Sequence, residues 1–329
     1  MSHSKDQGKH MFDATRSPRG PLAEPGRSMA ALAPSKGKPK KASLALLAAS
    51  WETGTCGARS IEITPLVIAA KLLCASLAIC TPPVRWWRKL MAACAAMASS
   101  GTGAALVTGA ASGIGAVVCS RLAERGWRVA GMDLDPSDTE LSLEVDVTDR
   151  EAVREAAARV QTSLAPVSLL IAAAGFYEMV PAGDIDALRW RRMIDVHLGG
   201  VANACWAVLP SMLESGAGTI VTVSSELALS GGNGDAHYVA AKGAILGFTR
   251  SLGAELAPRG IRVNSVAPGP TDTPLLAADS PSRDPAYLDT LPIGRLVRPE
   301  EVADTVLFMV EEGTYFSGQT LSPNAGAVI

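Results

Sequence analysis

The sequence predicts an α/β fold in which a doubly wound parallel sheet is covered by helices on both faces. From residue 98 onward, short apolar runs alternate with longer stretches in which apolar residues recur at helical spacing. In addition, an apolar strand, a glycine-rich turn and a helix follow one another over Ala104–Arg125, with the sequence AALVTGAASGIGAVVCSRLAER. Such a unit points the N-terminus of a helix at the carboxyl edge of a parallel sheet. We therefore expect a three-layer α/β/α domain.

Seven short runs are typical of buried strands, because they are apolar and bounded by polar or turn-forming residues. The predicted strands are Ala104–Val107, Trp127–Met132, Leu141–Val145, Val167–Ala173, Thr219–Val223, Arg262–Ala267 and Gln319–Ser322. The third follows the second almost at once, so no full helix fits between them. The segment from Pro268 to Leu296 is predicted to be a long polar loop.

The predicted helices begin and end at recognisable signals. In the first, apolar residues from Ile114 to Leu122 share one face, and Gly126 follows as a stop signal. A capping-box pattern at Thr148–Glu151 opens the second helix, and Pro299 in the first turn opens the last. The later helices are predicted over Glu151–Leu164, Trp190–Leu213, Ala236–Leu256 and Pro299–Val310.

Charge and cysteine content limit the partners and the compartment. The 329-residue chain has a formal net charge of −2, yet residues 1–96 hold 14 Lys and Arg against 5 Asp and Glu. The remainder is therefore acidic, which argues against nucleic acid as its partner. The six cysteines form no CxxC pair, so a cytoplasmic, reducing location is expected. No His, Cys and Asp residues have metal-ligand spacing, so no metal site is predicted.

Residues 1–97 are predicted to be an N-terminal extension, disordered or loosely packed, ahead of one folded domain at 98–329. Residues 1–60 are rich in Pro, Gly, Ser, Lys and Ala and show no sustained periodicity. Residues 61–84 are more apolar, but their longest uncharged run, Leu72–Val84, is too short to span a bilayer. A membrane-surface anchor at 61–90 is the less favoured alternative.

The glycine-rich turn has the composition of a phosphate-binding site. Backbone N–H groups at a helix N-terminus, together with the positive end of the helix dipole, hold a phosphate. Gly109 would allow the sharp turn, Gly113 would let the backbone approach a pyrophosphate, and Gly115 would let the helix pack closely on the strand. A glycine triplet alone is a weak signal, but the flanking strand and helix strengthen it. The turn therefore predicts a dinucleotide cofactor.

Asp133 bears on which dinucleotide is bound. It ends the second predicted strand, about twenty residues after the turn, where a carboxylate accepts hydrogen bonds from the adenosine ribose. A 2′-phosphate at that place would be repelled, and Ser112, rather than Arg or Lys, precedes Gly113. NAD is therefore favoured over NADP. The alternative is that Asp133 merely caps its strand beside Asp135.

Ser225, Tyr238 and Lys242 form the second constellation. Tyr238 and Lys242 are four residues apart on a predicted helix, so their side chains share a face. A cation beside a phenol lowers the pKa of the phenol toward the range of an acid–base catalyst. Ser225 follows a strand at the same sheet edge as the glycine turn and would bind an alcohol or carbonyl oxygen. The alternative is a solvated helix face, since such pairs also occur by chance.

Residues 98–329 resemble the short-chain dehydrogenase/reductase family, including its 3-oxoacyl-carrier-protein reductases. The motifs that carry the resemblance are TGAASGIG at Thr108–Gly115, AAAG at Ala172–Gly175, SSELALSGGNGDAHYVAAK at Ser224–Lys242 and VNSVAPGPTDTPLL at Val263–Leu276. The resemblance implies a Rossmann-type fold, and a homo-oligomer, dimer or tetramer, built on the helices at Trp190–Leu213 and Ala236–Leu256.

The resemblance also implies roles for individual residues. Tyr238 would be the general acid/base, Lys242 would bind the nicotinamide ribose, and Ser225 would orient the substrate oxygen. The loop from Thr273 to about Leu291 would close over the substrate. The expected cofactor-binding residues are Thr108, Gly109, Ser112, Gly113, Ile114, Gly115, Asp133, Leu134, Asp146, Val147, Ala173, Ala174, Gly175, Tyr238, Lys242, Pro268, Gly269, Thr271 and Thr273.

The chain departs from the family pattern at three places. Ala172–Gly175 stands where the family has Asn-Asn-Ala-Gly, and the adenine side lacks a full helix. His197 takes the place of the family's fourth catalytic residue, an Asn. It would hold a water, titrate and make activity pH-sensitive, or serve as a plain helix residue. Trp190 and Trp206 are expected to pack a helix interface. His237 is expected to face the substrate or the solvent.

These features predict reversible hydride transfer between a nicotinamide and the carbon of a secondary alcohol or ketone, with no metal. An acyl thioester, a steroid and a small cyclic alcohol remain open as substrates. The alternatives from other classes are a non-catalytic NAD(P)-binding regulatory module and a membrane-surface enzyme.

Overall fold

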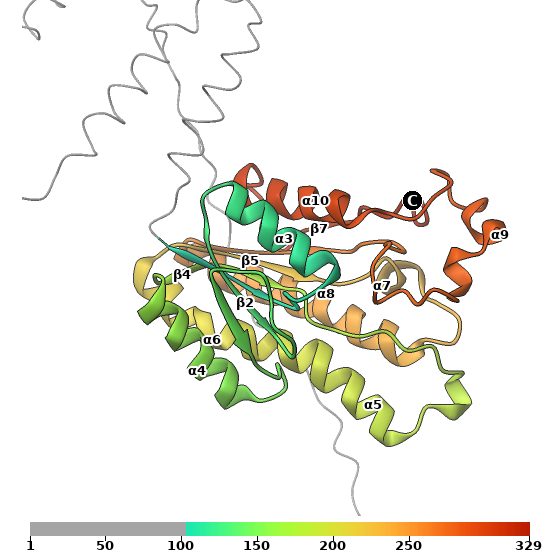
Figure 1. The fold of residues 1–329 in the computed structure, drawn as a ribbon, viewed down its shortest axis with the longest axis horizontal. Helices are drawn as coiled ribbons and strands as arrows, with labels where there is room; N and C mark the ends of the chain where they lie inside the picture. Colours follow the sequence, from blue (N-terminus) through green and yellow to red (C-terminus); the bar gives the residue numbers. More distant parts are fainter. Residues whose placement is uncertain (1–102) are drawn as a thin grey trace, which may run out of the picture. The chain divides into compact units, whose positions relative to one another are not determined.

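The computed structural model describes residues 103–329, so the predicted extension at 1–97 lies outside the described residues. The described part is an α/β fold with seven parallel strands in one sheet and helices on both faces (Figure 1). The strand order is β3-β2-β1-β4-β5-β6-β7. The chain thus runs outward from β1 to one edge, crosses back beside β1 and continues to the other edge. The predicted doubly wound parallel sheet is confirmed.

All seven predicted strands occur, displaced by at most one residue at either end. They are β1 (Ala104–Thr108), β2 (Arg128–Asp133), β3 (Leu141–Glu144), β4 (Val167–Ala172), β5 (Gly218–Val223), β6 (Ile261–Val266) and β7 (Thr320–Leu321). The longer helices are α3 (Gly113–Glu124), α4 (Arg150–Ser163), α5 (Ala187–Ile194), α6 (Gly200–Ser215), α8 (Ala236–Leu256) and α10 (Pro299–Glu311). The short helix α7 (Leu227–Ser230), which the sequence analysis missed, follows β5.

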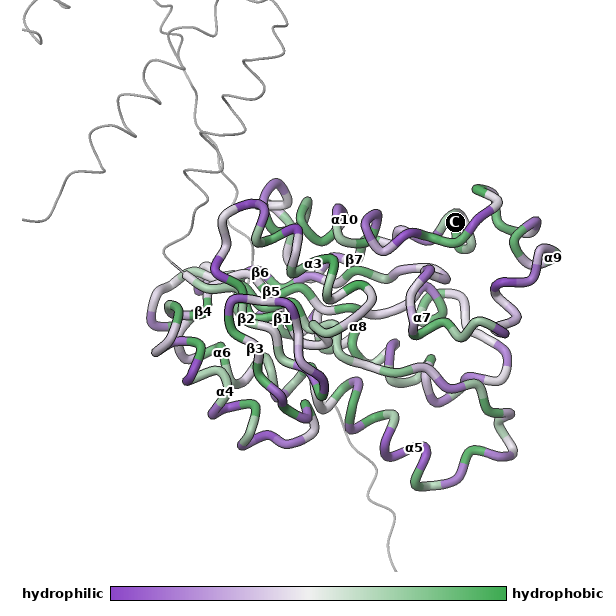
Figure 2. Tube along the Cα trace, viewed as in Figure 1, coloured by the Kyte–Doolittle hydropathy of each residue, from purple (hydrophilic) through white to green (hydrophobic). Residues whose placement is uncertain are grey.

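The alternation of side chains along the strands builds two apolar cores, one on each face of the sheet. Ala105 and Val107 of β1 face α3 and α10, whereas Leu106 faces α4, α6 and α8. All three residues are fully buried. Figure 2 shows the hydrophobic strands at the centre of the molecule, with hydrophilic stretches recurring along the helices that cover them. Both faces of the parallel sheet are covered, as its apolar strands require.

The predicted helix at Trp190–Leu213 differs in detail. Its N-terminus lies at Asp186, whose carboxylate accepts a hydrogen bond from the Arg189 N–H at 2.8 Å and so caps the helix. A π-helical turn, Asp195–Gly199, separates α5 from α6. Trp190 and Trp206 are 46% and 47% exposed. Trp206 of α6 nevertheless packs against α4, where the Arg150 guanidinium lies 4.7 Å from its ring centroid.

By length and composition, one helical run among the described residues is apolar enough to cross a membrane, Ala187–Ser215. Its most apolar 18-residue window has a mean hydropathy of 1.3. The same run supplies Val201, Val208 and Met212 to the core beneath the sheet. Its apolar character is therefore explained by packing in the α/β domain.

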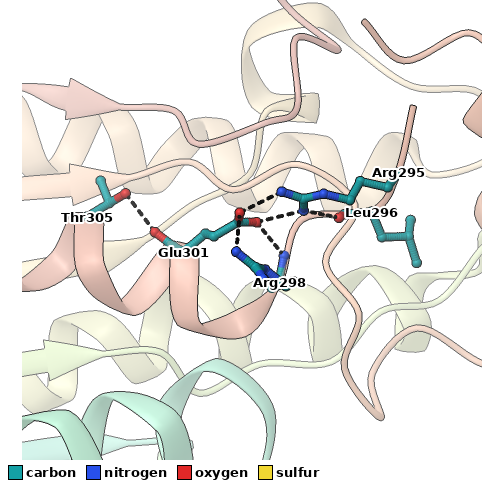
Figure 3. Close-up of polar contacts among 5 residues, drawn as sticks. All are labelled: Arg295, Leu296, Arg298, Glu301 and Thr305. Atoms are coloured by element: carbon teal, nitrogen blue, oxygen red, sulfur yellow. Dashed lines mark hydrogen bonds and ion pairs between the residues drawn. The ribbon is translucent and has the colours of Figure 1, made fainter. Parts of the chain in front are cut away.

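The segment after β6 is not a plain loop. It contains a 3₁₀ turn at Pro281–Arg283 and the short helix α9 (Pro285–Leu288). Its C-terminal end is held at α10, as Figure 3 shows. There Glu301 accepts hydrogen bonds from Arg295 Nη1 at 2.9 Å and Nη2 at 2.7 Å, and from the Arg298 N–H at 2.9 Å. These bonds fix the start of α10 and the end of the loop together.

Candidate active site

A cleft of about 280 Å³ opens at the carboxyl edge of the sheet. Segments that follow β1, β4, β5 and β6 line it, together with α8 and the segment after Thr273. The strand order reverses beside β1, and ligands of open α/β sheets bind at such a switch point. The topology thus brings the glycine turn and the Ser225 region to the same edge.

The three glycines of the turn have distinct geometric roles. Gly109 and Gly113 have φ values of 72° and 54°, which other residues adopt only with strain. A Cβ on Gly115 would lie 1.9 Å from the Gly109 carbonyl oxygen, so α3 can approach the turn only with glycine there. Ser112 is extended, and its side chain makes no capping hydrogen bond to α3. The N-terminus of α3 is therefore open to a ligand on the cleft side, and Ile114 of its first turn lines the cleft.

Thr108, which is expected to contact the cofactor, makes two hydrogen bonds within the protein. Its side chain is buried, and its Oγ1 accepts the N–H groups of Ala173 and Ala174, each at 3.2 Å. These bonds join the end of β1 to the turn after β4. They hold the segment Ala172–Gly175 in place, where the two Asn side chains of the family pattern are missing.

Asp133 lies at the end of β2, beside the glycine turn. Its Oδ2 accepts the Ala111 N–H at 2.9 Å, and its Oδ1 accepts the Leu134 N–H at 2.7 Å. The side chain thus does cap its strand, but it also reaches across to the turn that would hold the pyrophosphate. Leu134, the next residue, is 68% exposed. The strand-capping alternative is therefore confirmed, and the binding of a ribose stays a prediction.

Asp146 and Val147 follow β3, the neighbour of β2 in the sheet. The exposed Asp146 Oδ1 accepts hydrogen bonds from the N–H and the hydroxyl of Thr148, both at 2.8 Å. Val147 is buried against Gly200, and its carbonyl accepts a 2.9 Å hydrogen bond from Asn203. Only a short connection separates β2 from β3, as predicted, so no helix lies between these two strands in the described sequence.

Ser225, Tyr238 and Lys242 all line the cleft, and all three are at most 8% exposed. The Lys242 Nζ donates a 2.9 Å hydrogen bond to the Val223 carbonyl and lies 5.7 Å from the centre of the Tyr238 ring. The ammonium therefore lies beside the phenol without a direct hydrogen bond to it. Residues from the end of β5 and from α8 are thus brought together as a single cluster.

The electrostatics of this cluster differ from the sequence-based expectation. Burial, followed by the nearby carboxylate of Glu226, raises the pKa of the Tyr238 phenol above its ordinary value, although Ser225 acts in the opposite direction. Burial also lowers the pKa of Lys242 to about 7. The expectation that the cation sets a low phenol pKa therefore does not hold in the free protein. Desolvation outweighs the attraction, because both groups are buried.

Glu226 is the acidic group that the sequence analysis missed. It is 6% exposed, and its Oε2 accepts a 2.9 Å hydrogen bond from the Ser225 hydroxyl. Burial raises its pKa to about 7. The only available signal was its position directly after Ser225, at the end of a buried strand. The Glu226 carboxyl is therefore a further titratable group beside Tyr238 and Lys242.

His197 lies in the π-helical turn and lines the cleft, in edge-on contact with Tyr238 at 5.4 Å between ring centroids. Its Nε2 lies 2.8 Å from the Phe176 carbonyl, and its ring fills the space beside Gly175. Burial lowers its pKa to about 3. The expectation that His197 titrates near neutral pH is therefore wrong, because the imidazolium would be desolvated. Gly175 is required here, since a Cβ would lie 2.4 Å from the ring.

His237 is fully buried, so it does not face the solvent, and it is not among the residues that line the cleft. Neither of its ring nitrogens has a hydrogen-bond partner among the described residues. Its Nε2 lies 3.9 Å from the Glu178 Oε1. The expectation that it faces substrate or solvent is wrong, because α8 turns His237 away from the cleft that Tyr238 lines.

The segment after β6 forms the remaining wall. The Pro268 carbonyl accepts the Glu226 N–H at 3.0 Å, and Gly269 packs so closely on Asn324 that a Cβ would lie 2.7 Å from its Cα. Thr271 is buried, with its hydroxyl donating to the Gly269 carbonyl at 2.8 Å. Thr273 lies against Gly113. The segment thus joins the Ser225 side of the cleft to the glycine turn.

No cluster of three or more His, Cys, Asp or Glu residues that would hold a metal ion occurs within 103–329.

Comparisons with known proteins agree with this arrangement. Cis-4-hydroxycyclohexanecarboxylate dehydrogenase of Sinomonas cyclohexanicum is 39% identical over 225 residues, which are 64% of this chain and 90% of that protein. The 3-oxoacyl-(acyl-carrier-protein) reductase FabG of Thermotoga maritima is 32% identical over 238 residues, 68% of this chain and 97% of that protein.

A solved structure is also similar to this chain. The ligand-free aldohexose dehydrogenase of Thermoplasma acidophilum matches with a TM-score of 0.64 and 28% identity, covering 68% of this chain and 93% of that one. The family model described as short chain dehydrogenase matches residues 103–284. The chain belongs to the short-chain dehydrogenase/reductase family of oxidoreductases.

Proposed function

We propose that this protein is an NAD-dependent oxidoreductase that interconverts a secondary alcohol and a ketone, with Tyr238 as the general acid/base. The observation that carries the proposal is the burial of Ser225, Tyr238 and Lys242 in one cleft, next to a glycine turn that suits a dinucleotide. The relatives named above are dehydrogenases and a reductase, which supports the same class of reaction.

The residues present fit a nicotinamide dinucleotide. The open N-terminus of α3 and the positive φ values of Gly109 and Gly113 suit a pyrophosphate, and the Asp133 carboxylate suits a ribose hydroxyl. A 2′-phosphate would meet the Asp133 charge, which favours NAD over NADP. When bound, the nicotinamide would accept or supply the hydride.

The protein's own residues supply the proton and the position. The raised pKa of Tyr238 keeps the phenol protonated in the free protein, which is the form that donates a proton to a carbonyl oxygen. In the direction of alcohol oxidation, the phenol would first have to lose its proton, and the phenolate oxygen would then take the hydroxyl proton. Ser225 would hold the reacting oxygen, and Lys242 would bind a ribose hydroxyl once its ammonium leaves the Val223 carbonyl. Closure of the cleft would exclude water.

The substitution Tyr238→Phe tests this proposal. A panel of secondary alcohols with NAD, and of ketones with NADH, is read by absorbance of the reduced cofactor. We expect turnover to fall by about 10²-fold or more, because a proton transfer is lost. NADH fluorescence should report cofactor binding in both proteins. Equal turnover in the two proteins would refute Tyr238 as the general acid/base, and cofactor binding without turnover in either protein would favour the non-catalytic binding module.

We further propose a homo-oligomer in a reducing cytoplasm. The half-exposed Trp190 and Trp206, on α5 and α6, support an interface between copies of the chain. Cys119 and Cys205 are buried free thiols, which suits a reducing compartment. Sedimentation velocity of the wild type and of Trp206→Lys tests the assembly. A monomer in both cases would contradict it.

A further inference from the structure

We infer that the cleft selects a neutral ring substrate with a second hydroxyl next to the reacting carbon, and that Glu226 binds that second hydroxyl. The inference rests on the proposed function, because it names the substrate class of the same site. Three features carry it: the position of Glu226, an opposite wall built from Tyr177 and Asp235, and the lack of a free cation among the residues that line the cleft.

Glu226 adjoins the place where the reacting oxygen would lie. Its Oε2 is bonded to the Ser225 hydroxyl at 2.9 Å, and Ser225 would hold the reacting oxygen of the substrate. No side-chain hydrogen bond to its Oε1 occurs among the described residues, although the backbone N–H groups of Glu226 and Leu227 act on the carboxylate and lower its pKa. A hydroxyl on the carbon next to the reacting one would lie one bond farther along the substrate. The second carboxylate oxygen would be its acceptor.

Tyr177 and Asp235 form the opposite wall. The Tyr177 ring meets the Tyr238 ring edge-on, with 5.0 Å between centroids, and its hydroxyl donates a 3.1 Å hydrogen bond to Asp235 Oδ2. The Tyr177 oxygen can therefore accept a hydrogen bond from the substrate but has no proton left to give. Asp235 is 3% exposed, and its Oδ1 has no partner among the described residues. That oxygen is enclosed by protein, so within this wall only the Tyr177 oxygen is available to accept a hydrogen bond from the substrate.

The charges on the lining disfavour an anion. Of the described residues that line the cleft, only Lys242 and His197 are basic. Lys242 is bonded to the Val223 carbonyl, and His197 is neutral because burial lowers its pKa to about 3. A substrate carboxylate would therefore find two buried carboxyl groups and no available counter-charge, and burial of an unpaired charge is costly.

A hydroxyl fits this lining better than an ammonium group. Burial raises the pKa of Glu226 to about 7, so near neutral pH its carboxyl both donates and accepts hydrogen bonds. A hydroxyl also does both, whereas an ammonium only donates. The remaining wall, from Leu227, Leu275 and Tyr287, suits the apolar face of a ring.

The experiment compares four alcohols with NAD as acceptor: cyclohexane-1,2-diol, cyclohexanol, cis-4-hydroxycyclohexanecarboxylate and 2-aminocyclohexanol. In the wild type, we expect kcat/KM for the diol to exceed that for cyclohexanol by about 10- to 100-fold, the value of a hydrogen bond to a charged group. In Glu226→Gln, the preference should fall to within about threefold, and the carboxylate should become a better substrate. Glu178→Gln, which removes a carboxylate outside the cleft, should keep the wild-type preference.

Several results would overturn the inference. One is a preference of the wild type for cyclohexanol, the carboxylate or the amino alcohol over the diol. Another is an unchanged preference for the diol in Glu226→Gln. If no alcohol or ketone is turned over, the proposed function fails, and binding still decides the substrate class. In that case, thermal shifts with NAD present should be larger for the diol than for cyclohexanol in the wild type only. Equal shifts in the wild type and Glu226→Gln would refute the role of Glu226.

Discussion

The buried carboxyl of Glu226 predicts a change in stability that needs no substrate. Burial raises its pKa from 4.5 to about 7. The folded state therefore binds this proton more tightly than the unfolded state does. Its favourable contribution is fully present below pH 4.5 and is lost as the pH rises through about 7. At about 1.4 kcal/mol per pH unit, ionisation inside the fold costs on the order of 3 kcal/mol at pH 9.

The substitution Glu226→Gln removes that cost and keeps the shape of the side chain. The amide oxygen still accepts the Ser225 hydroxyl, so little should change at pH 4.5, where the wild-type carboxyl is protonated. At pH 9 the variant should be more stable than the wild type by about 2–3 kcal/mol, or roughly 4–12 °C in Tm for a domain of this size. Lys242 titrates in both proteins, so its contribution cancels in the difference.

Thermal unfolding followed by circular dichroism at pH 4.5, 7 and 9 measures this difference. Glu300→Gln is the matched control, because Glu300 is exposed in the first turn of α10, and its Tm difference should stay nearly flat across the same range. A Tm difference for Glu226→Gln that is the same at pH 4.5 and pH 9, or that favours the wild type at pH 9, would refute the reasoning from burial.

The remaining predictions concern the cofactor side and the neighbouring histidine. Asp133→Ala should weaken NAD binding by about tenfold and NADP binding less, since a ribose acceptor and a repulsive charge are both lost; an unchanged ratio of the two dissociation constants would remove Asp133 from the site. Gly115→Ala should cost more than about 3 kcal/mol, because its Cβ would lie 1.9 Å from the Gly109 carbonyl oxygen. Gly183→Ala, with nothing within 4 Å, should change the Tm little, and similar urea midpoints for these two variants would contradict the packing argument. The His197 ring should not titrate between pH 5 and 8 in proton NMR spectra, because burial lowers its pKa to about 3; a chemical-shift midpoint near 6.5 would show that the ring is solvated.

The strands and the glycine turn could be predicted from the sequence because their signals are local. Apolar runs bounded by turn residues located every strand to within one residue, and the spacing of Gly109, Gly113 and Gly115 matched a specific turn geometry. The break at Asp195–Gly199 could not be seen, since the apolar pattern of α5 and α6 continues through it.

The pKa values of the site residues could not be predicted from the sequence either. The spacing of four between Tyr238 and Lys242 predicts a shared helix face, but not that the Val223 carbonyl binds the ammonium. Likewise, the sequence around His197 does not indicate that its ring fills the space beside Gly175. Burial decides these pKa values, and burial depends on how the segments after β4, β5 and β6 come together.

The anchoring of the segment after β6 has a consequence for evolution and for engineering. Thr271 pairs with Val297, and the Asp272 N–H donates to the Val297 carbonyl at 2.9 Å, so the two ends of the intervening stretch are pinned side by side. The Arg295–Glu301 contacts reinforce the outgoing end. Residues 274–296 therefore begin and end on a fixed base, so a change in their length costs little in loop closure. The exposed part of this segment can vary in evolution while Thr273, which lies against Gly113, and the buried Leu291 stay in place.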